Sequence, residues 1–346
     1  MADTVPAAAA PPAHPTEKNI SDEEAALYDR QIRLWGAAAQ SRLQAARVLL
    51  AGRFRGIAVD TAKNVVLAGV GSLTLLDGEE LLVEDLGSNY FARVEEVGQK
   101  RVEASAPRVQ ALNPRVNLST ETDASKLFSE EFLSAFDLVV VTDVDAPTVL
   151  KLNNLTRKLG KKFFAAGSIG MDGWMFADLL EHEYIVDIHK ALQPGETTPV
   201  IVPTKSTATY VPFSLALDSK LEKVRKRELK RLGASFWATL SLFAAQRDLD
   251  PSPALPTATT VSEEQLKKAA DKLLPTLNAP ADALPEAEIS RLALVQAAEF
   301  PPSCAIVGGL LGQDILNCVG GKEEPLRNFT VYEGATGQMR VSQLGL

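Results

Sequence analysis

The chain has 346 residues, of which 46% are hydrophobic and 23% charged, a balance typical of a globular protein of about two domains. Its formal net charge of -8 disfavours a protein whose main task is binding nucleic acid. Two cysteines without CxxC spacing disfavour a structural zinc site and a disulfide framework, and we see no apolar run near the ~20 residues of a membrane span. We therefore expect a soluble, intracellular protein with no membrane and no nucleic-acid partner.

The N-terminal segment divides into a tail and a helix. Residues 1–19 are rich in Ala and Pro and have almost no large apolar group, so we expect a disordered tail. Ser21 followed by Glu24 is a capping box, which predicts that a helix begins here. Tyr28, Ile32 and Trp35 recur near helical spacing, which predicts one apolar face on this helix.

Short apolar runs then alternate with helical stretches. Strands are predicted at 47–51, 72–76, 116–120, 137–142 and 162–166, and helices at 57–67, 97–112, 124–135 and 146–159. The continuously apolar run at 138–141 is typical of a parallel strand buried on both faces. This order predicts an α/β fold with a doubly wound, mostly parallel, Rossmann-like sheet.

The pattern changes after Gly170. We expect an antiparallel pair of strands at 173–180 and 184–188, and a Pro/Thr-rich stretch without a clear period at 192–209. Helices are predicted at 214–232, 234–247, 262–274, 285–299 and 303–319, and strands at 329–333 and 338–343, with a Pro-rich linker at 250–260. We divide the chain into a tail (1–19), a first part of the sheet domain (20–190), an insertion of strand or loop and then helices (191–300) and a closing helix with two strands (301–346).

The turn from Gly52 to Gly56 is a candidate phosphate loop. Its GxxxG spacing departs from the dinucleotide fingerprint, and the side chains between the glycines add bulk where bare backbone is needed. Asp77 lies 25 residues after Gly52, where a ribose-binding acid is expected. Asp77 is therefore a weak candidate for cofactor binding. The simpler interpretation, which we favour, is that it is a polar residue at the end of a strand.

Other reactive side chains favour structural roles. Cys304 stands among apolar neighbours, which indicates a packed core cysteine. His182 and His189 do not have the spacing of a helical zinc pair, so we expect no metal site on this chain. The basic run 220–231 fits the charged face of an amphipathic helix, with nuclear targeting by residues 223–231 as an alternative.

The segment Tyr28-Asp-Arg-Gln-Ile-Arg-Leu-Trp-Gly36 resembles the N-terminal signature of the activating enzymes for ubiquitin and ubiquitin-like proteins, which have a ThiF/MoeB-type adenylation fold. Further segments resemble that family in the same order: Ala62-Lys-Asn64, Leu67-Ala-Gly-Val70, Leu75-Leu-Asp77, the Leu-Asn-Pro turn that ends at Pro114, and the helix Ala305–Asp314. The resemblance covers roughly residues 21–190 and 300–343.

The length of the chain indicates which kind of family member it resembles. A single-chain activator is about three times longer, so this chain resembles the smaller subunit of a heterodimeric activating enzyme. The stretch Phe176–Glu183 is similar to the subunit that serves the modifier SUMO. The resemblance implies a larger catalytic partner subunit in an obligate heterodimer, SUMO as a further partner, and a location in the nucleus and cytoplasm.

The chain departs from the catalytically competent members of this family. Where those members carry Asn and Arg, this chain has Ser88 and Asn89, and Arg101 stands where they have Lys. Asp143 falls where competent members place a magnesium-binding Asp. The family's zinc-binding CxxC pairs and thioester-forming cysteine are absent. The resemblance therefore implies that ATP and Mg are bound mainly by the partner subunit and that the isolated chain is inactive.

Arg30 is the residue of this chain to which the resemblance assigns a catalytic role. In the family, the Arg of the Tyr-Asp-Arg-Gln motif reaches in trans to the phosphates of ATP on the other half of the dimer. Without the family, Arg30 and Arg33 are two solvated arginines near Asp29. Three alternatives stay open: the equivalent subunit for another ubiquitin-like modifier, a stand-alone Rossmann NAD(P)-dependent oxidoreductase, and a scaffold without contact to ATP.

Overall fold

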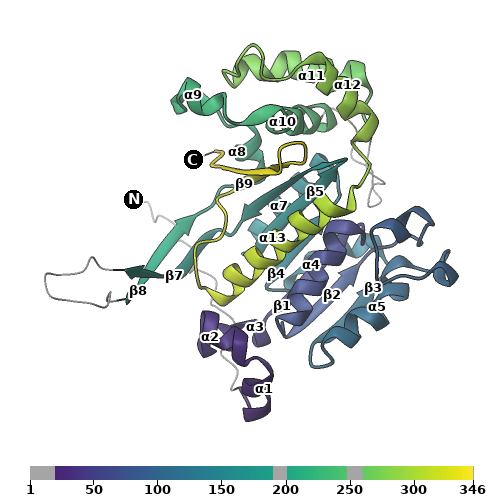
Figure 1. Ribbon diagram of the computed structural model, residues 1–346, viewed down its shortest axis with the longest axis vertical. Coiled ribbons are helices and arrows are strands. Elements are labelled where there is room, and N and C mark those ends of the chain that lie inside the picture. Colours follow the sequence, from purple (N-terminus) through teal and green to yellow (C-terminus); the bar gives the residue numbers. More distant parts are fainter. Residues whose placement is uncertain (1–19, 190–200, 248–259, 346) are drawn as a thin grey trace, which may run out of the picture.

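The computed structural model describes residues 20–189, 201–247 and 260–345. Its centre is an eight-stranded sheet in the order β10-β9-β6-β5-β4-β1-β2-β3 (Figure 1). The strands are β1 (Arg47–Gly52), β2 (Ser72–Leu76), β3 (Asn117–Glu121), β4 (Leu138–Thr142), β5 (Lys162–Ile169), β6 (Asp172–Asp178), β9 (Phe329–Glu333) and β10 (Gln338–Ser342). Five neighbouring strands, β5, β4, β1, β2 and β3, are parallel to one another. β6, β9 and β10 extend the sheet beyond β5, and each is antiparallel to its neighbours. The prediction of a mostly parallel α/β sheet is confirmed.

Helices cover both faces of this sheet. The longer ones are α3 (Ala37–Ala45), α4 (Gly56–Leu67), α5 (Arg101–Leu112), α7 (Ala146–Lys158), α10 (Gly233–Arg247), α11 (Glu263–Thr276), α12 (Glu286–Val295) and α13 (Pro301–Gly320). α4 and α13 lie side by side across one face (Figure 1). On the other face, α7 and α10 enclose a second core, which α11 and α12 extend outward. Each face therefore has its own apolar cluster, as expected for a sheet buried on both sides.

The C-terminal strands return to the sheet next to β6, although residues 190–300 separate them from it in sequence. The boundaries drawn from the sequence at residues 190 and 300 stay predictions. The tail at 1–19 and most of the linker at 250–260 lie outside the described residues.

The antiparallel pair expected at 173–180 and 184–188 is wrong. β6 pairs instead with β5 and β9, and Leu180 has a left-handed backbone conformation (φ 61°) that turns the chain away from the sheet. The following strand, β7 (Glu181–His189), pairs with β8 (Ile201–Thr209) in a separate two-stranded ribbon that extends from the body (Figure 1). β8 lies in the stretch where the sequence has no clear period, because the positions on its less exposed face include the small or polar residues Thr204, Ser206 and Ala208, which give no hydrophobic alternation.

Three predicted helices are interrupted. The stretch 214–232 forms α8 (Phe213–Leu217), the 3-10 turn η4 (Leu221–Lys223) and α9 (Lys226–Leu229), since Phe213 packs on Phe176 and Phe243 and fixes a short first piece. The stretch 124–135 forms η3 (Ala124–Phe128) and α6 (Glu130–Ser134), separated by Ser129, which caps α6. The third interruption is at the N-terminus.

The N-terminal stretch forms α1 (Asp22–Leu27) and α2 (Asp29–Trp35), which meet at Tyr28. The predicted capping box is confirmed: Ser21 accepts a hydrogen bond from the Glu24 amide, and the Glu24 carboxylate accepts one from the Ser21 amide. Tyr28 is buried against Gly69, and its hydroxyl accepts a hydrogen bond from Asn113 at 2.8 Å. This tertiary contact interrupts the single helix predicted from the apolar spacing. Two 3-10 turns complete the chain between β2 and α5: η1 (Glu84–Gly87) and η2 (Val94–Glu96).

Candidate functional site

The loop after β1 occupies the place where a Rossmann-like fold binds phosphate. Gly52 has φ 108°, and a Cβ atom there would lie 2.1 Å from the carbonyl oxygen of Thr142 on the neighbouring strand, so this position requires glycine. Phe54 is 2% exposed, and its amide donates a hydrogen bond to Asp77 at 2.8 Å. The loop therefore places the Phe54 side chain in the core, and the Phe54 amide binds Asp77 of the same chain and is not available to a phosphate.

Asp77 lies at the end of β2 in a buried ion-pair network. It is 1% exposed and accepts hydrogen bonds from the amides of Phe54 and Glu79 and from the guanidinium of Arg101. Arg101 is fully buried and also donates to Asp85 at 2.9 Å and to Glu79 at 3.2 Å. Burial by itself lowers the pKa of Arg101, but the carboxylates of Asp77 and Asp85 outweigh it and raise that pKa. Asp77 is thus bound to this chain's own arginine.

Ser88 and Asn89 are also used internally. The Ser88 hydroxyl donates to Glu299 at 2.6 Å. Asn89 is 1% exposed, and its side-chain amide donates to Ser105 at 3.0 Å and to the carbonyl oxygen of Phe54. Glu299, in turn, forms an ion pair with Arg55 at 3.1 Å. Burial, with the nearby negative charge of Asp143, raises the pKa of Glu299.

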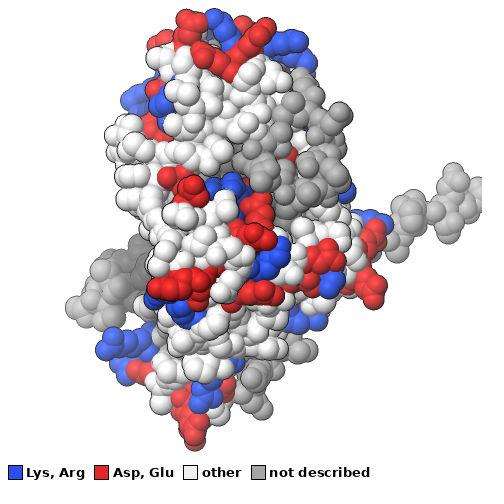
Figure 2. Space-filling view, turned by 90° about the vertical axis from the view of Figure 1, so that its right-hand side faces the viewer, with Lys and Arg blue, Asp and Glu red and all other residues white. Residues whose placement is uncertain are grey.

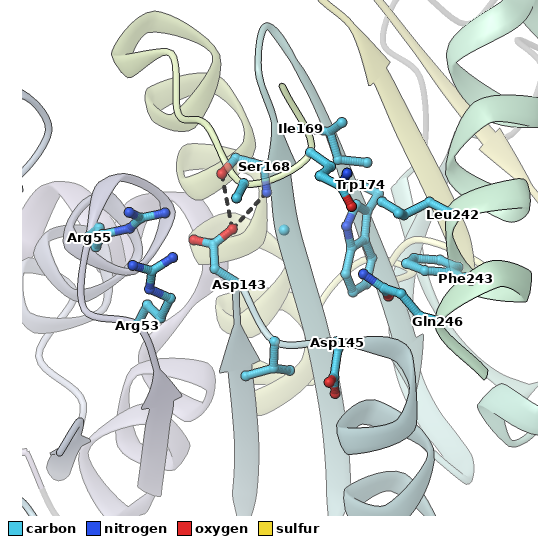
Figure 3. Close-up of a pocket in the computed structure, with 14 residues that line it drawn as sticks. Arg53, Arg55, Asp143, Asp145, Ser168, Ile169, Trp174, Leu242, Phe243 and Gln246 are labelled. Carbon is cyan, nitrogen blue, oxygen red and sulfur yellow. Dashed lines mark hydrogen bonds between the residues drawn. The ribbon is translucent and has the colours of Figure 1, made fainter. Parts of the chain in front are cut away.

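Asp143 follows β4 and has a left-handed backbone conformation (φ 52°), which is uncommon for a residue with a side chain. It is 8% exposed, and its Oδ1 accepts hydrogen bonds from the Ser168 amide at 2.8 Å and hydroxyl at 3.0 Å. Its Oδ2 has no hydrogen-bond partner among the described residues. Asp143 lines a small pocket of about 30 Å³ together with Arg53 and Arg55 (Figure 3).

The structure separates the sequence-predicted site residues. Asp77, Ser88, Asn89 and Arg101 lie around the carboxyl ends of the strands, but Arg30 does not join them. Arg30 is exposed on α2, and the same helix contributes Leu34 and Trp35 to a groove at the C-terminal end of α13, far from Glu299, which precedes the first turn of α13. The role predicted for Arg30 stays a prediction.

The cysteines and the buried histidine lie in packed surroundings. Cys304 and Cys318 are 1% and 0% exposed, and burial raises the pKa of Cys318 to about 11 and that of Cys304 still further. His182 is buried, with Nδ1 3.1 Å from the Lys162 ammonium. Among the residues described, no three His, Cys, Asp or Glu side chains gather as a metal site.

The sequence alone missed Glu299. This residue forms the ion pair with Arg55 and accepts the hydrogen bond from Ser88, which lies 211 positions earlier in the chain. No local motif marks it, and only the return of α13 to the loop after β1 brings it there. The contact is close: a Cβ atom on Gly56 would lie 2.7 Å from Cys304 in the first turn of α13.

One helix in the described part of the chain, α13, is long and apolar enough to cross a membrane. In its most apolar window of 18 residues, 67% are buried within the fold, where α13 packs on α4, α3 and β6. This burial fits a core helix of the sheet domain. On the face shown in Figure 2, basic and acidic side chains are interspersed across the middle of the molecule.

The ThiF family pattern matches residues 28–345, nearly the whole described chain. The chain belongs to the ThiF family. It is 36% identical to "SUMO-activating enzyme subunit 1" of Homo sapiens, with 94% of this chain and 96% of that protein covered. It is 35% identical to "DNA damage tolerance protein RHC31" of Saccharomyces cerevisiae, with 93% and 97% covered. The crystal structure of SeMet PaaA shares the fold, with a TM-score of 0.55 and 15% identity over 94% of this chain and 84% of that one.

Proposed function

We propose that this ThiF-family chain is the smaller, non-catalytic but required subunit of a heterodimeric SUMO-activating enzyme. The larger partner subunit would bind ATP and Mg, adenylate the C-terminal glycine of SUMO and capture it as a thioester on a cysteine. The relatives called SUMO-activating enzyme subunit 1, which match over nearly full length, support the choice of modifier. For a subunit with this role we propose a location in the nucleus and also in the cytoplasm.

The single structural observation behind the non-catalytic assignment is the internal ion pairing at the carboxyl ends of the strands. Arg101 binds Asp77 and Asp85, and Arg55 binds Glu299. The residues present do not fit a nucleotide, because Phe54 fills the loop and Asp77 is bound to Arg101. The same burial of Asp77 disfavours a stand-alone NAD(P)-dependent oxidoreductase.

A required subunit without a competent site of its own must contribute something to its partner. We propose that Arg30 supplies a guanidinium in trans to the phosphates of ATP held by the partner. Its exposure on α2 leaves it accessible for such a contact, and a guanidinium is always charged and matches phosphate oxygens in geometry. ATP bound to the partner would supply the adenylyl group, with pyrophosphate as the leaving group, and this chain would supply positive charge near the phosphates.

The test is ATP–pyrophosphate exchange with purified SUMO. We expect exchange and thioester formation from the reconstituted heterodimer and neither from this chain alone. Exchange by the isolated chain would overturn the non-catalytic assignment. Exchange by the heterodimer with another ubiquitin-like modifier, and none with SUMO, would overturn the choice of modifier.

A further inference from the structure

The N-terminal helices α2 and α3 attach to the body of the molecule at the C-terminal end of α4 (Figure 1). A helix leaves its last carbonyl oxygens without α-helical partners, so other donors must bind them. Three side-chain amides donate to successive carbonyl oxygens at this end of α4: Asn113 to Val66 at 3.0 Å, Gln31 to Leu67 at 3.2 Å and Gln40 to Ala68 at 3.0 Å. Two of these three donors come from α2 and α3.

Tyr28, at the junction of α1 and α2, belongs to the same set of contacts. Its hydroxyl accepts a hydrogen bond from the Asn113 amide that also donates to Val66. Its ring lies on the bare backbone of Gly69, where a Cβ atom would lie 2.4 Å from the hydroxyl oxygen. Tyr28 is 3% exposed and Asn113 6%, so water hardly competes for this hydrogen bond. The Tyr28 hydroxyl therefore fixes the place where α2 begins.

α2 depends on these contacts for its position. It has seven residues, none of them buried, and so short a helix is only marginally stable by itself. Tyr28 and Gln31 are three positions apart, which places them on the same side of the chain, and both contact groups at the end of α4. Arg30 lies about 100° around the helix axis from Gln31 and is exposed.

α4 is a firm support for α2. Nine of its twelve residues are buried, and it packs on α13 and on the core of one face of the sheet. Its twelve residues span about 18 Å, from the loop after β1 to the N-terminal helices. Arg30 is thus held at the opposite end of α4 from this chain's own strand ends, as a role in trans requires.

We propose that Tyr28 and Gln31 are positioning residues for Arg30: their hydrogen bonds at the end of α4 fix the orientation in which α2 presents the guanidinium to ATP on the partner subunit. This inference rests on the proposed role of Arg30 in trans. Displacement of a group by about 1 Å can cost about a hundredfold in rate, so a loosened α2 slows the reaction even when the charge is still present. Tyr28 and Gln31 act on ATP only through α2 and Arg30.

Single-turnover adenylation of SUMO by the reconstituted heterodimer tests the proposal. Tyr28→Phe removes one hydroxyl and Gln31→Met one amide, and each should slow adenylation by about three- to tenfold with the half-saturating SUMO concentration unchanged. In the Arg30→Ala background each should have less than about a twofold further effect, because the group that they position is absent. Gln31→Met tests the proposal even if Tyr28→Phe fails to fold.

Tyr210→Phe is the matched control. Tyr210 is 1% exposed, and its hydroxyl donates to the carbonyl oxygen of Pro325 at 3.1 Å. The control therefore removes an equally buried hydroxyl with a hydrogen bond of its own, but one that does not hold α2. We expect it to keep the parent rate of adenylation.

Tryptophan fluorescence of the full chain measures the position of α2 without any activity. Trp35, the last residue of α2, is half-buried and donates to Gln40 at 3.0 Å. The other two tryptophans of the chain, Trp174 and Trp237, are 3% and 1% exposed, so quenching by acrylamide reports mainly on Trp35. Quenching should increase in Tyr28→Phe and Gln31→Met and stay at the parent level in Tyr210→Phe.

The outcomes separate this inference from the proposed function. Parent-like rates or unchanged quenching in both Tyr28→Phe and Gln31→Met, beside a slow Arg30→Ala, overturn the positioning role and leave the proposed function in place. Equal losses of rate with and without Arg30 also overturn it, since the two residues would then act independently of Arg30. A parent-like rate in Arg30→Ala overturns the role of Arg30 itself, and the positioning role with it.

Discussion

Arg101 and Asp77 form a fully buried ion pair, with side chains 0% and 1% exposed, at the end of β2 where a nucleotide-binding sheet places its ribose-binding acid. The two residues are 24 positions apart, and α5 brings the guanidinium back to the strand end. Asp85 and Glu79 share the same guanidinium. An internal arginine therefore takes the place that a nucleotide would need at this carboxylate.

The first prediction concerns the stability of this network. Arg101→Met leaves Asp77 and Asp85 buried without their counter-ion, and the loss of one partner of a buried pair typically costs about 3–5 kcal/mol of unfolding free energy. Urea unfolding followed by circular dichroism measures it. The control is Arg47→Met, which removes a half-exposed ion pair with Asp137 and should cost less than about 1 kcal/mol. Equal losses in the two variants would contradict the prediction.

The second prediction concerns Asp314 on α13. The residue is 3% exposed, and the amide of Leu326 donates to both carboxylate oxygens, at 3.0 and 3.1 Å. Burial raises its pKa to about 7, whereas the ordinary value is 3.8. Between these values the folded protein retains a proton that the unfolded chain releases. The unfolding free energy contributed by Asp314 therefore falls as pH rises from about 4 to about 7, and changes no further above that.

Asp314→Asn removes this titration, while the amide oxygen can still accept the hydrogen bond from Leu326. Urea unfolding at pH 6 and pH 8 should show a larger loss of stability on going to pH 8 in the parent protein than in the variant. The titration of Asp314 changes the unfolding free energy of the parent protein by at most about 1.4 kcal/mol per pH unit, and the variant should lack this contribution. Parallel pH profiles in the two proteins would show that Asp314 does not titrate in this range.

The third prediction concerns the two cysteines. Because Cys304 and Cys318 are buried and their pKa values are raised, Cys304→Ala and Cys318→Ala should leave thioester yield on the reconstituted heterodimer nearly unchanged. Each variant should lose about 1–2 kcal/mol of unfolding free energy, as is usual for trimming a core side chain. Non-reducing gels of the SUMO thioester measure the yield. A loss of thioester from a folded heterodimer would identify a nucleophile on this chain.

The sequence predicted most of the sheet, because its parallel strands have a strong local signal. β2 and β9 begin and end at the predicted residues, and β4 differs from the prediction by only one. The signal is strongest in β4, which is apolar from Leu138 to Val141 because helices cover both faces of the sheet. The ribbon of β7 and β8 has no such signal, since its strands lie outside the main sheet and only one of their faces packs on the body, through residues such as Tyr184 and Ala208.

The candidate site was less predictable than the fold. The sequence locates Ser88 and Asp143, but the partners that determine their chemistry, Glu299 and Ser168, come from elements distant in the chain. Tyr28 shows the same limit: its contact with Asn113 divides a helix whose apolar spacing is continuous. Tertiary contacts of this kind override local propensity and cannot be read from spacing alone.

The last prediction concerns Arg30 and its neighbour Arg33. The two lie on the same helix and are both exposed, but Arg33 forms an ion pair with Asp29 at 3.0 Å, whereas Arg30 has no ion pair within the described residues. If Arg30 contacts the phosphates of ATP on the partner subunit, Arg30→Ala should leave the heterodimer intact. It should slow adenylation of SUMO by about one to three orders of magnitude, or roughly 1.4–4 kcal/mol of transition-state stabilisation.

Single-turnover adenylation by the reconstituted heterodimer at saturating ATP measures this effect, because it separates the chemical step from ATP binding. Arg30→Lys should recover only part of the rate, since a point charge does not reproduce the planar fork of a guanidinium. Arg33→Ala is the matched control, one helical turn away, and should keep nearly the parent rate. A parent-like rate in Arg30→Ala would leave this chain as a scaffold, and equal losses in both alanine variants would indicate damage to α2 instead of a missing charge at the phosphates.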